Sequence, residues 1–266
     1  MTDTNQTWLA LLGALSTNGS RINPRGNPSV ELIGTQTQID MNAPVVTIKE
    51  RALGYRFMAA EAAWIIRGDN RVETIGPYAA HIKAFSDDGV YYQGAYGPMV
   101  IDQISYVASK LNEDPSSRQA ILTIWRPNPR PSKDIPCTIA IQWFIRDGML
   151  HCIDTMRSSD VWLGYPYDIV NFSCLSWYLR ALLREVYGIV VDMGSLMLQA
   201  GSQHYYERNE EAITAILSGC SSLDQNPRLN ERWDLATPQR IIADIELAKD
   251  QPLGFLELAN MSSNAV

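Results

Sequence analysis

The sequence predicts an α+β fold in which a mixed β-sheet packs against helices. Two alternating runs, TIAIQWFIR and MLHCIDTMR, are joined by Asp147-Gly148, which favours the tight turn of a β-hairpin. Helical spacing over residues 98–112 and 168–187 mixes with these strands without a strict strand–helix–strand alternation. No repeat or linker divides the chain, so we expect residues 1–266 to form a single domain.

Three further elements are expected before the hairpin: a helix over residues 5–17, a strand over residues 30–40 and a helix over residues 49–67. The first helix ends near Asn18-Gly19, and a loop rich in proline, glycine and asparagine follows over residues 20–29. This loop carries Arg21 and Arg25. The second helix stops at Gly68-Asp69-Asn70.

The composition excludes several classes of protein. The chain has 266 residues, 46% hydrophobic and 19% charged, which is ordinary for a globular protein and unlike a disordered one. The net charge of −7 argues against a surface for polymeric nucleic acid, although a single nucleotide needs only a few local arginines. No apolar run approaches the roughly 20 residues that span a bilayer. The first residues lack the basic segment and cleavage site of a signal peptide.

The cysteines and histidines indicate a reduced protein without a metal site. The four cysteines are few for this length and show no paired spacing, so we expect free thiols in a cytoplasmic protein. The three histidines lie at no zinc-like spacing from another ligand, and we expect no metal.

Cys137 is the candidate nucleophile. It follows Pro136 at the entrance to the first strand of the hairpin, with Arg126, Arg130 and Arg157 on either side. Cationic neighbours activate a thiol by lowering its pKa. In a regular hairpin, Cys137 and Arg157 lie close together on neighbouring strands. The alternative is a buried cysteine that acts as a small apolar side chain.

The segment MRSSDVWLGYPYDIVNF contains a candidate anion site. Arg157 and Ser158 supply the guanidinium and the hydroxyl that typically hold a phosphate, although Arg157 also suits a surface salt bridge. Gly164 and Pro166 indicate a turn that leads into a helix. Asp168 then falls near the start of this helix, where a carboxylate is also a good N-cap.

Three other side chains are candidates for a site. Glu61 lies in the apolar helical stretch AAEAAWII, where a glutamate is either exposed or held in a pocket for proton transfer. His204 and Tyr206, in GSQHYYERN, are suited to bind a sugar hydroxyl, or else they satisfy each other.

Taken together, these segments resemble the thymidylate synthase family. The similarity runs in order from about residue 20 to residue 210, through EAAWIIRGDN, Tyr96-Gly97, DPSSRQAILTIWRP, IPCT, RSSDVWLGYPYDIVNF and GSQHYY. Three residues depart from the pattern of thymidylate synthases, and the combination of Cys137-Thr138, the R-S-x-D run over residues 157–160 and Asp168 resembles the bacteriophage deoxycytidylate (dCMP) hydroxymethylase branch. Thr138 stands where thymidylate synthases have a histidine, Gln119 where they have an arginine, and Asp168 where they have the asparagine that reads the base. The end of the chain, FLELANMSSNAV, does not match the family's closing tail.

The resemblance implies a mechanism. Cys137 adds to C6 of a pyrimidine, so that C5 becomes the nucleophile toward the one-carbon unit of 5,10-methylenetetrahydrofolate. Glu61 manages proton transfers through ordered water, and Asp168 contacts the base. Capture of the transferred carbon by water gives a hydroxymethyl product, whereas a hydride from the folate gives a methyl product. We favour hydroxymethyl on the branch resemblance alone.

The resemblance also implies the binding residues. The phosphate of a nucleoside monophosphate is held by Arg25, Arg157, Ser158 and, from the second subunit of a homodimer formed through the sheet, Arg118. His204 and Tyr206 bind the sugar. Asp160, Gly164 and Trp64 contact the folate, although Trp64 also suits the core.

Several alternatives remain open at this point. One is a methyltransferase that acts on dCMP or CMP and releases dihydrofolate, and another is a thymidylate synthase that acts on dUMP. Two further alternatives do not involve one-carbon transfer. One is a cysteine hydrolase that uses Cys137 and His204, and the other is a non-catalytic nucleotide sensor. The sequence does not distinguish ribose from deoxyribose, and a phage that modifies its DNA cytosines is one natural setting.

Overall fold

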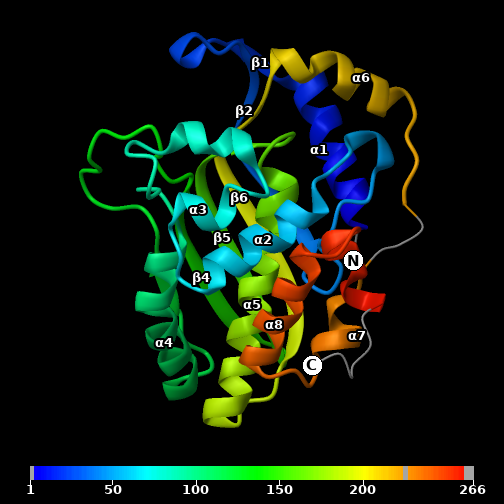
Figure 1. Cartoon of the computed structure of the whole chain (residues 1–266). Helices are drawn as coiled ribbons and strands as arrows, with labels where there is room; N and C mark the ends of the chain where they lie inside the picture. The colour runs from blue at the N-terminus through cyan, green and yellow to red at the C-terminus, as the bar shows by residue number, and fades with distance from the viewer. Residues whose placement is uncertain (1–2, 224–226, 261–266) are drawn as a thin grey trace.

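The computed structural model describes residues 3–223 and 227–260. Within them, six strands form one mixed sheet in the order β1-β2-β6-β5-β4-β3 (Figure 1). The strands are β1 (Ser20–Ile22), β2 (Ser29–Asp40), β3 (Ile121–Thr123), β4 (Thr138–Arg146), β5 (Met149–Asp160) and β6 (Asp192–Tyr206). The helices are α1 (Thr4–Asn18), α2 (Tyr55–Ile66), α3 (Val72–Ile75), α4 (Gly97–Glu113), α5 (Tyr165–Tyr187), α6 (Glu210–Ser218), α7 (Leu229–Trp233) and α8 (Pro238–Lys249).

The predicted hairpin is confirmed. Strands β4 and β5 pair antiparallel from Arg146 opposite Met149 back to Thr138 opposite Met156. Asp147 and Gly148 both have positive φ, 51° and 74°, as the tight hairpin turn requires. Strand β5 then runs parallel to β6, and α5 makes the crossover between them. The mixed sheet packed against helices confirms the predicted α+β class.

Helix α5 lies directly on the sheet. It contacts β5 and β6 on one side and α2 and α8 on the other, as Figure 1 shows from the helix side. Contacts on both sides explain why its sequence is largely apolar and lacks a continuous polar face. The helix begins at Tyr165 rather than at residue 168, and it ends before Gly188, whose φ of 70° is left-handed.

The other predicted elements are mostly confirmed. The helices expected over residues 5–17 and 98–112 and the strand expected over residues 30–40 are α1, α4 and β2. The single helix predicted over residues 49–67 is wrong. Lys49–Arg51 form a short 3-10 turn, Ala52 has a left-handed φ of 48° that interrupts the helix, and α2 begins at Tyr55. The loop predicted over residues 20–29 contains β1, which pairs with β2.

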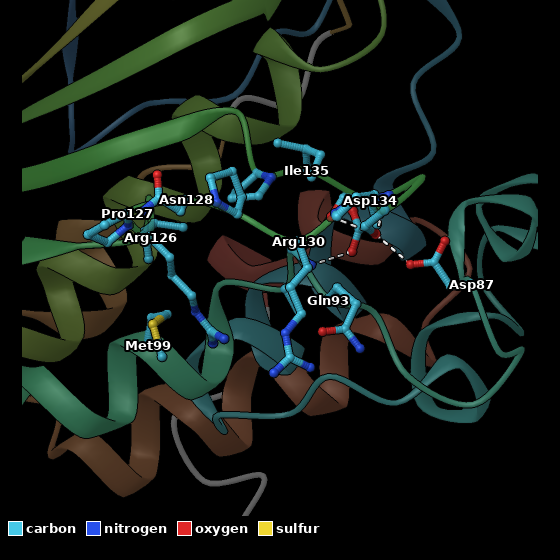
Figure 2. Close-up of a pocket in the computed structure, with 16 residues that line it drawn as sticks. Asp87, Gln93, Met99, Arg126, Pro127, Asn128, Arg130, Asp134 and Ile135 are labelled. Carbon is cyan, nitrogen blue, oxygen red and sulfur yellow. Dashed lines mark hydrogen bonds between the residues drawn. The ribbon is translucent and has the colours of Figure 1, made fainter.

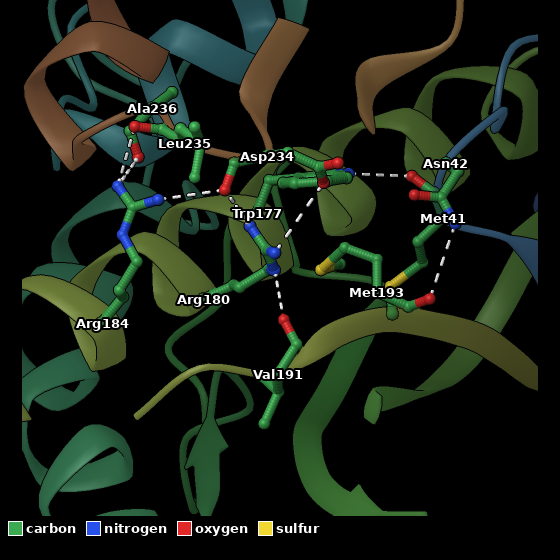
Figure 3. A network of polar contacts seen from close by, with 10 residues as sticks. All are labelled: Met41, Asn42, Trp177, Arg180, Arg184, Val191, Met193, Asp234, Leu235 and Ala236. Atoms are coloured by element: carbon green, nitrogen blue, oxygen red, sulfur yellow. Dashed lines mark hydrogen bonds and ion pairs between the residues drawn. The ribbon is translucent and has the colours of Figure 1, made fainter. Parts of the chain in front are cut away.

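Two arginines of α5 hold the segment between α7 and α8 (Figure 3). Arg180 is buried and donates from Nε to the carbonyl oxygen of Val191 at 2.6 Å and from Nη1 to that of Asp234 at 2.9 Å. Arg184 donates to the carbonyl oxygens of Leu235 and Ala236 at 2.9 Å each. These bonds satisfy loop carbonyls that no helix or strand would satisfy, and they fix the α7–α8 connection against α5.

The two faces of the sheet differ. On β5, Leu150, Cys152 and Met156 are buried on the face that α5 covers. On the opposite face, Ile153 and Thr155 are only half-buried, as are their neighbours on β6. That face is therefore partly exposed in a single copy of the chain. Among the described residues, no helix combines the length and apolar character needed to cross a bilayer.

Candidate active site

Five polar side chains from different elements meet where β5 ends and α5 begins. Cys137 immediately precedes β4, Asp160 ends β5, Asp168 lies in the first turn of α5, Glu61 lies in α2, and Tyr96 precedes α4. Burial is the main cause of their raised pKa values, and Asp168 further raises those of Cys137 and Tyr96. Glu61 in turn raises the pKa of Asp168. Charge effects of this kind require short distances, so these side chains are neighbours.

Arg157 holds the backbone around Cys137. Its backbone N–H donates to the carbonyl oxygen of Cys137 at 2.8 Å, as expected for neighbouring strands. Its guanidinium donates from Nε to the carbonyl oxygen of Pro136 and from Nη2 to that of Ile135, both at 3.0 Å. The guanidinium also lies 6.0 Å from the Trp125 ring centroid. The alternative role of Arg157 in a surface salt bridge is wrong, because its partners in the described part of the chain are carbonyl oxygens and a ring.

The Cys137 thiol is not activated in the free protein. The side chain is half-buried, and burial raises its pKa more than the Arg157 guanidinium lowers it. The expectation that the flanking arginines lower this pKa is therefore wrong as a net effect. Arg126 and Arg130 extend instead along a cavity of about 540 Å³ beside Pro136, where Gln93 lies near Arg130 (Figure 2).

Asp168 does not cap its helix. The residue before the first turn of α5 is Gly164, and no side chain makes a capping hydrogen bond there. No hydrogen bond to the Asp168 carboxyl is formed within the described residues. Burial, followed by the charges of Glu61 and Asp160, raises its pKa well above the ordinary range. The Asp168 carboxyl group therefore takes up a proton more readily than an exposed aspartate, and in its protonated form it offers both a donor and an acceptor.

Glu61 is held in a pocket rather than exposed. Asn171 of α5 donates from Nδ2 to Glu61 Oε2 at 2.8 Å. Burial raises the pKa of Glu61 to about 7, although the Asn171 hydrogen bond lowers it. A carboxyl group with this pKa both releases and accepts protons near neutral pH, as a general acid or base must.

Asp160 and His204 lie opposite each other on β5 and β6. Asp160 Oδ1 accepts from the backbone N–H groups of Trp162 and Leu163 at 2.8 and 2.9 Å, while its buried Oδ2 has no partner among the described residues. His204 Nδ1 is likewise buried without a partner in the described chain. Tyr206 meets His204 edge to face at 5.4 Å between ring centroids, a contact that satisfies neither polar atom. Polar atoms left open in this way are suited to a ligand.

The other residues predicted to bind the phosphate are not all gathered at this site. Ser158 follows Arg157 on β5, but the guanidinium groups of Arg25 and Arg118 form no hydrogen bond or ion pair within the described residues. Arg25 belongs to an exposed turn with a left-handed φ of 53°. A single subunit therefore brings Arg157 and Ser158 together and leaves Arg25 and Arg118 unpaired at the surface.

Trp64 and Gly164 frame the site from two sides. Trp64 packs edge to face against Tyr92 with 5.7 Å between ring centroids, and its buried Nε1 has no partner among the described residues. The core alternative for Trp64 therefore describes its packing but leaves its polar atom unexplained. At Gly164, an added Cβ would lie 3.2 Å from Asp168 Oδ2, so glycine keeps this side of the Asp168 carboxyl open.

Sequence reasoning named Tyr96 and Thr138 without giving them a role in the site, and it missed Asn171 and Asp154. Tyr96 accepts a hydrogen bond from the backbone N–H of Thr138 at 3.2 Å, and Asn171 orients Glu61. Asp154 is fully buried on β5 with both carboxyl oxygens unpartnered in the described structure, as is the Thr138 hydroxyl. A signal for Asp154 was present, because it occupies an inward position of an alternating strand where apolar residues are expected.

In the described residues, no group of three histidine, cysteine or acidic side chains is arranged to hold a metal ion. The sequence matches the family model described as thymidylate synthase over residues 6–249, which is most of the chain and includes every residue placed above. Members of this family transfer a one-carbon unit from methylenetetrahydrofolate to a pyrimidine nucleotide. With a match of this extent, the chain belongs to the thymidylate synthase family.

Proposed function

We propose that this enzyme converts dCMP, methylenetetrahydrofolate and water into 5-hydroxymethyl-dCMP and tetrahydrofolate. The observation that carries the choice of cytosine is Asp168, a buried carboxyl group that lies beside Cys137 and forms no hydrogen bond within the described residues. The choice of a hydroxymethyl product and of deoxyribose rests on the similarity of Cys137-Thr138, the R-S-x-D run over residues 157–160 and Asp168 to the dCMP hydroxymethylase branch.

Asp168 complements the Watson–Crick edge of cytosine. Its O–H donates to N3, and its carbonyl oxygen accepts from the 4-amino group. Because N3 of cytosine is basic, the proton shifts toward it and the bond gains charge assistance. Uracil carries an N–H at N3 and cannot take up the proton there. It can pair with the protonated acid through N3–H and O4, but this pairing gains no charge assistance, and against the carboxylate form O4 of uracil finds no donor. The resulting difference amounts to a few kcal/mol, or roughly a hundredfold in kcat/KM.

The same proton assists Cys137. Protonation at N3 draws electrons from C6, so that the thiolate adds there although burial disfavours the free thiolate. Arg157 fixes the backbone that carries the thiol. Glu61, with a pKa of about 7, exchanges protons with the base through an ordered water. The catalytic residues in this proposal are Cys137, Glu61 and Asp168.

The phosphate is bound by Arg157 and Ser158, joined by Arg25 and by Arg118 from a second subunit. Two N–H groups of the Arg157 guanidinium are engaged by carbonyl oxygens, and the other three remain for the phosphate. His204 and Tyr206 bind the sugar, which gives the open His204 Nδ1 a partner.

Two observations support a homodimer formed through the sheet. The sheet face opposite α5 is only half-buried, and the Arg118 guanidinium has no partner among the residues that the structure describes. Pairing of two such faces covers the apolar side chains and delivers Arg118 to the neighbouring phosphate site. We treat residues 1–266 as one domain of this dimer. The four free thiols suit a cytoplasmic enzyme, including one made by a phage in its host.

The residues present fit a folate. The open Asp160 Oδ2 and Trp64 Nε1 offer an acceptor and a donor to a pterin ring, and Gly164 leaves the backbone accessible beside them. When bound, methylenetetrahydrofolate supplies the one-carbon unit at the oxidation level of formaldehyde. Asp160 and Trp64 would orient it toward C5, and water reaching the transferred carbon yields the hydroxymethyl group.

The test compares dCMP with dUMP in the wild type and in Asp168→Asn. Wild type should have the higher kcat/KM for dCMP, and the asparagine variant should shift the ratio toward dUMP by about a hundredfold. A product mass increased by CH2O indicates hydroxymethylation, and an increase of CH2 indicates methylation. A wild type that prefers dUMP, or a ratio that Asp168→Asn leaves unchanged, would contradict the proposal.

A further inference from the structure

A buried carboxyl group lies beneath the nucleophile without any partner. Asp154 is 0% exposed, and neither of its oxygens forms a hydrogen bond with a described residue. The hydroxyl of Thr138 is also 0% exposed and likewise forms no hydrogen bond with a described residue. Leaving such groups unpaired in the interior costs on the order of 1–3 kcal/mol each. A partner that arrives with a ligand accounts for groups kept in this state.

The position of Asp154 connects it with the active site. It projects from β5 on the face that α5 covers, between Cys152 and Met156. Burial raises its pKa, and the charge of Asp168 raises it further. The Thr138 hydroxyl lowers it because it lies close to the carboxyl group, although the two groups do not meet the geometry of a formed hydrogen bond. Asp154 is therefore close to Asp168 on one side and to Thr138, the residue after the nucleophile, on the other.

The proposed substrate has one polar group still without a partner. The 4-amino group of cytosine carries two N–H bonds, and Asp168 accepts only the one on the N3 side. The second N–H, on the C5 side, needs an acceptor when the base is enclosed, because an unmet donor loses its hydration without compensation. Near Asp168, the unpartnered buried acceptors in the described residues are those of Thr138, Asp154, Asp160 and Asn171. The Asp160 oxygen is assigned above to the folate. Asn171 is already tied to Glu61 through its amide.

We propose that Thr138 and Asp154 form a second contact for the base, in which they accept the C5-side N–H of the cytosine 4-amino group. This inference rests on the proposed function, since it presupposes a cytosine nucleotide. Asp168 and the Thr138–Asp154 pair then bracket the 4-amino group from both sides. Asp154 is a specificity-determining residue that the assignment of Cys137, Glu61 and Asp168 leaves out.

The chemistry of the pair decides which variants are informative. The Asp154 carboxyl group and the Thr138 hydroxyl each offer an acceptor to the 4-amino group. Each also carries a proton, and either group can accept the proton of the other so that it does not point at the base. Asp154→Asn keeps an acceptor of the same shape and should retain the contact. Asp154→Leu and Thr138→Val remove a polar group at similar volume. Because Asp154→Leu also removes an unpaired buried carboxyl group, it should leave the fold as stable as the wild type or more so.

The test measures nucleotide binding without folate, using dCMP and N4-methyl-dCMP in a calorimeter. The methylated nucleotide keeps the N–H for Asp168 and replaces the C5-side N–H with a methyl group. Wild type should bind it far more weakly than dCMP. In Asp154→Leu the methyl group meets an apolar side chain, so the ratio of the two Kd values should fall by about tenfold or more. Any conformational preference of the free ligand is common to both proteins and cancels.

Controls separate this contact from packing and from the choice of base. Cys152→Ala alters packing on the same face of β5 and should leave the Kd ratio unchanged, as should Asp244→Asn at a buried carboxylate that Arg240 and Trp233 contact. If the ratio of the two Kd values in Asp154→Leu equals that of the wild type, the inference is overturned, whereas the preference for cytosine is unaffected. Thr138→Val is measured in the same way if Asp154→Leu does not fold. A wild type that binds dUMP more tightly than dCMP instead removes the proposed function, and the inference with it.

Discussion

Arg157 and Cys137 are joined across neighbouring strands: the backbone N–H of Arg157 donates to the carbonyl oxygen of Cys137 at 2.8 Å. The Arg157 side chain then turns back to the two residues before the nucleophile and donates to their carbonyl oxygens. One arginine therefore sets the position of the loop that carries the thiol, and it also adds a positive charge beside it. Burial nevertheless outweighs that charge, so the pKa of the thiol lies above that of an ordinary cysteine.

Replacement of the nucleophile should abolish turnover and leave the fold intact. We expect Cys137→Ser to lose at least about three orders of magnitude in kcat, because a hydroxyl is far less acidic and less nucleophilic than a thiol. Circular dichroism and the melting temperature should match the wild type. Cys152→Ser and Cys220→Ser serve as controls and should keep most of the activity. More than a tenth of the wild-type rate in Cys137→Ser would remove Cys137 from the mechanism.

The protonation of Cys137 can be followed by alkylation. Since burial raises the pKa of this thiol, iodoacetamide should modify Cys137 slowly at pH 7, and the rate should rise as the pH passes through a pKa above that of an ordinary cysteine. Arg157→Met removes the charge that opposes burial and should shift the midpoint to still higher pH. Mass spectrometry of the modified peptide gives the rate at each pH. A midpoint below the ordinary cysteine value would contradict the effect of burial.

Subunit complementation tests the shared phosphate site. Arg118→Ala and Cys137→Ser homodimers should each be inactive. After subunit exchange, one site of each heterodimer combines an intact Cys137 with an intact Arg118 from the other chain. Half of the dimers in the mixture are heterodimers, and each of these has one functional site out of two. Activity should therefore return to about a quarter of the wild-type level. Exchange is verified with two affinity tags. Verified heterodimers without activity would show that Arg118 does not act across subunits.

The sequence predicted the fold better than the protonation states of the site. Periodicity and the Asp147-Gly148 turn are local signals, which is why the hairpin and α1, α4 and α5 were found. The break at Ala52 was missed because a left-handed alanine leaves no mark in the sequence. The raised pKa values of Asp168 and Cys137 depend on burial by α2, α4 and α5 together, and motif spacing carries no information on that burial.

Glu61 should make the stability depend on pH. Its pKa of about 7 in the folded protein exceeds the ordinary value of 4.5, so between these values the folded state holds a proton that the unfolded chain has lost. The stability that this proton provides is fully present below pH 4.5 and is lost as the pH rises through 7. The difference of roughly 2.5 pKa units corresponds to about 3 kcal/mol.

Glu61→Gln removes this titration, since the amide stays neutral in both states and still accepts a hydrogen bond from Asn171. We expect the variant to gain up to about 3 kcal/mol over the wild type on going from pH 4.5 to pH 8, measured as the difference in unfolding free energy from urea titrations. Asp154 contributes a slope of the same sign that is present in both proteins and cancels from the difference. Asp168 adds to the gain of the variant, because removal of the Glu61 charge lowers the pKa of Asp168 and so reduces the stability it loses as the pH rises. Glu211→Gln on the exposed face of α6 is the matched control and should shift stability equally at both pH values. If Glu61→Gln behaves like this control, then Glu61 is not a buried acid, and its role in proton transfer at neutral pH loses its physical basis.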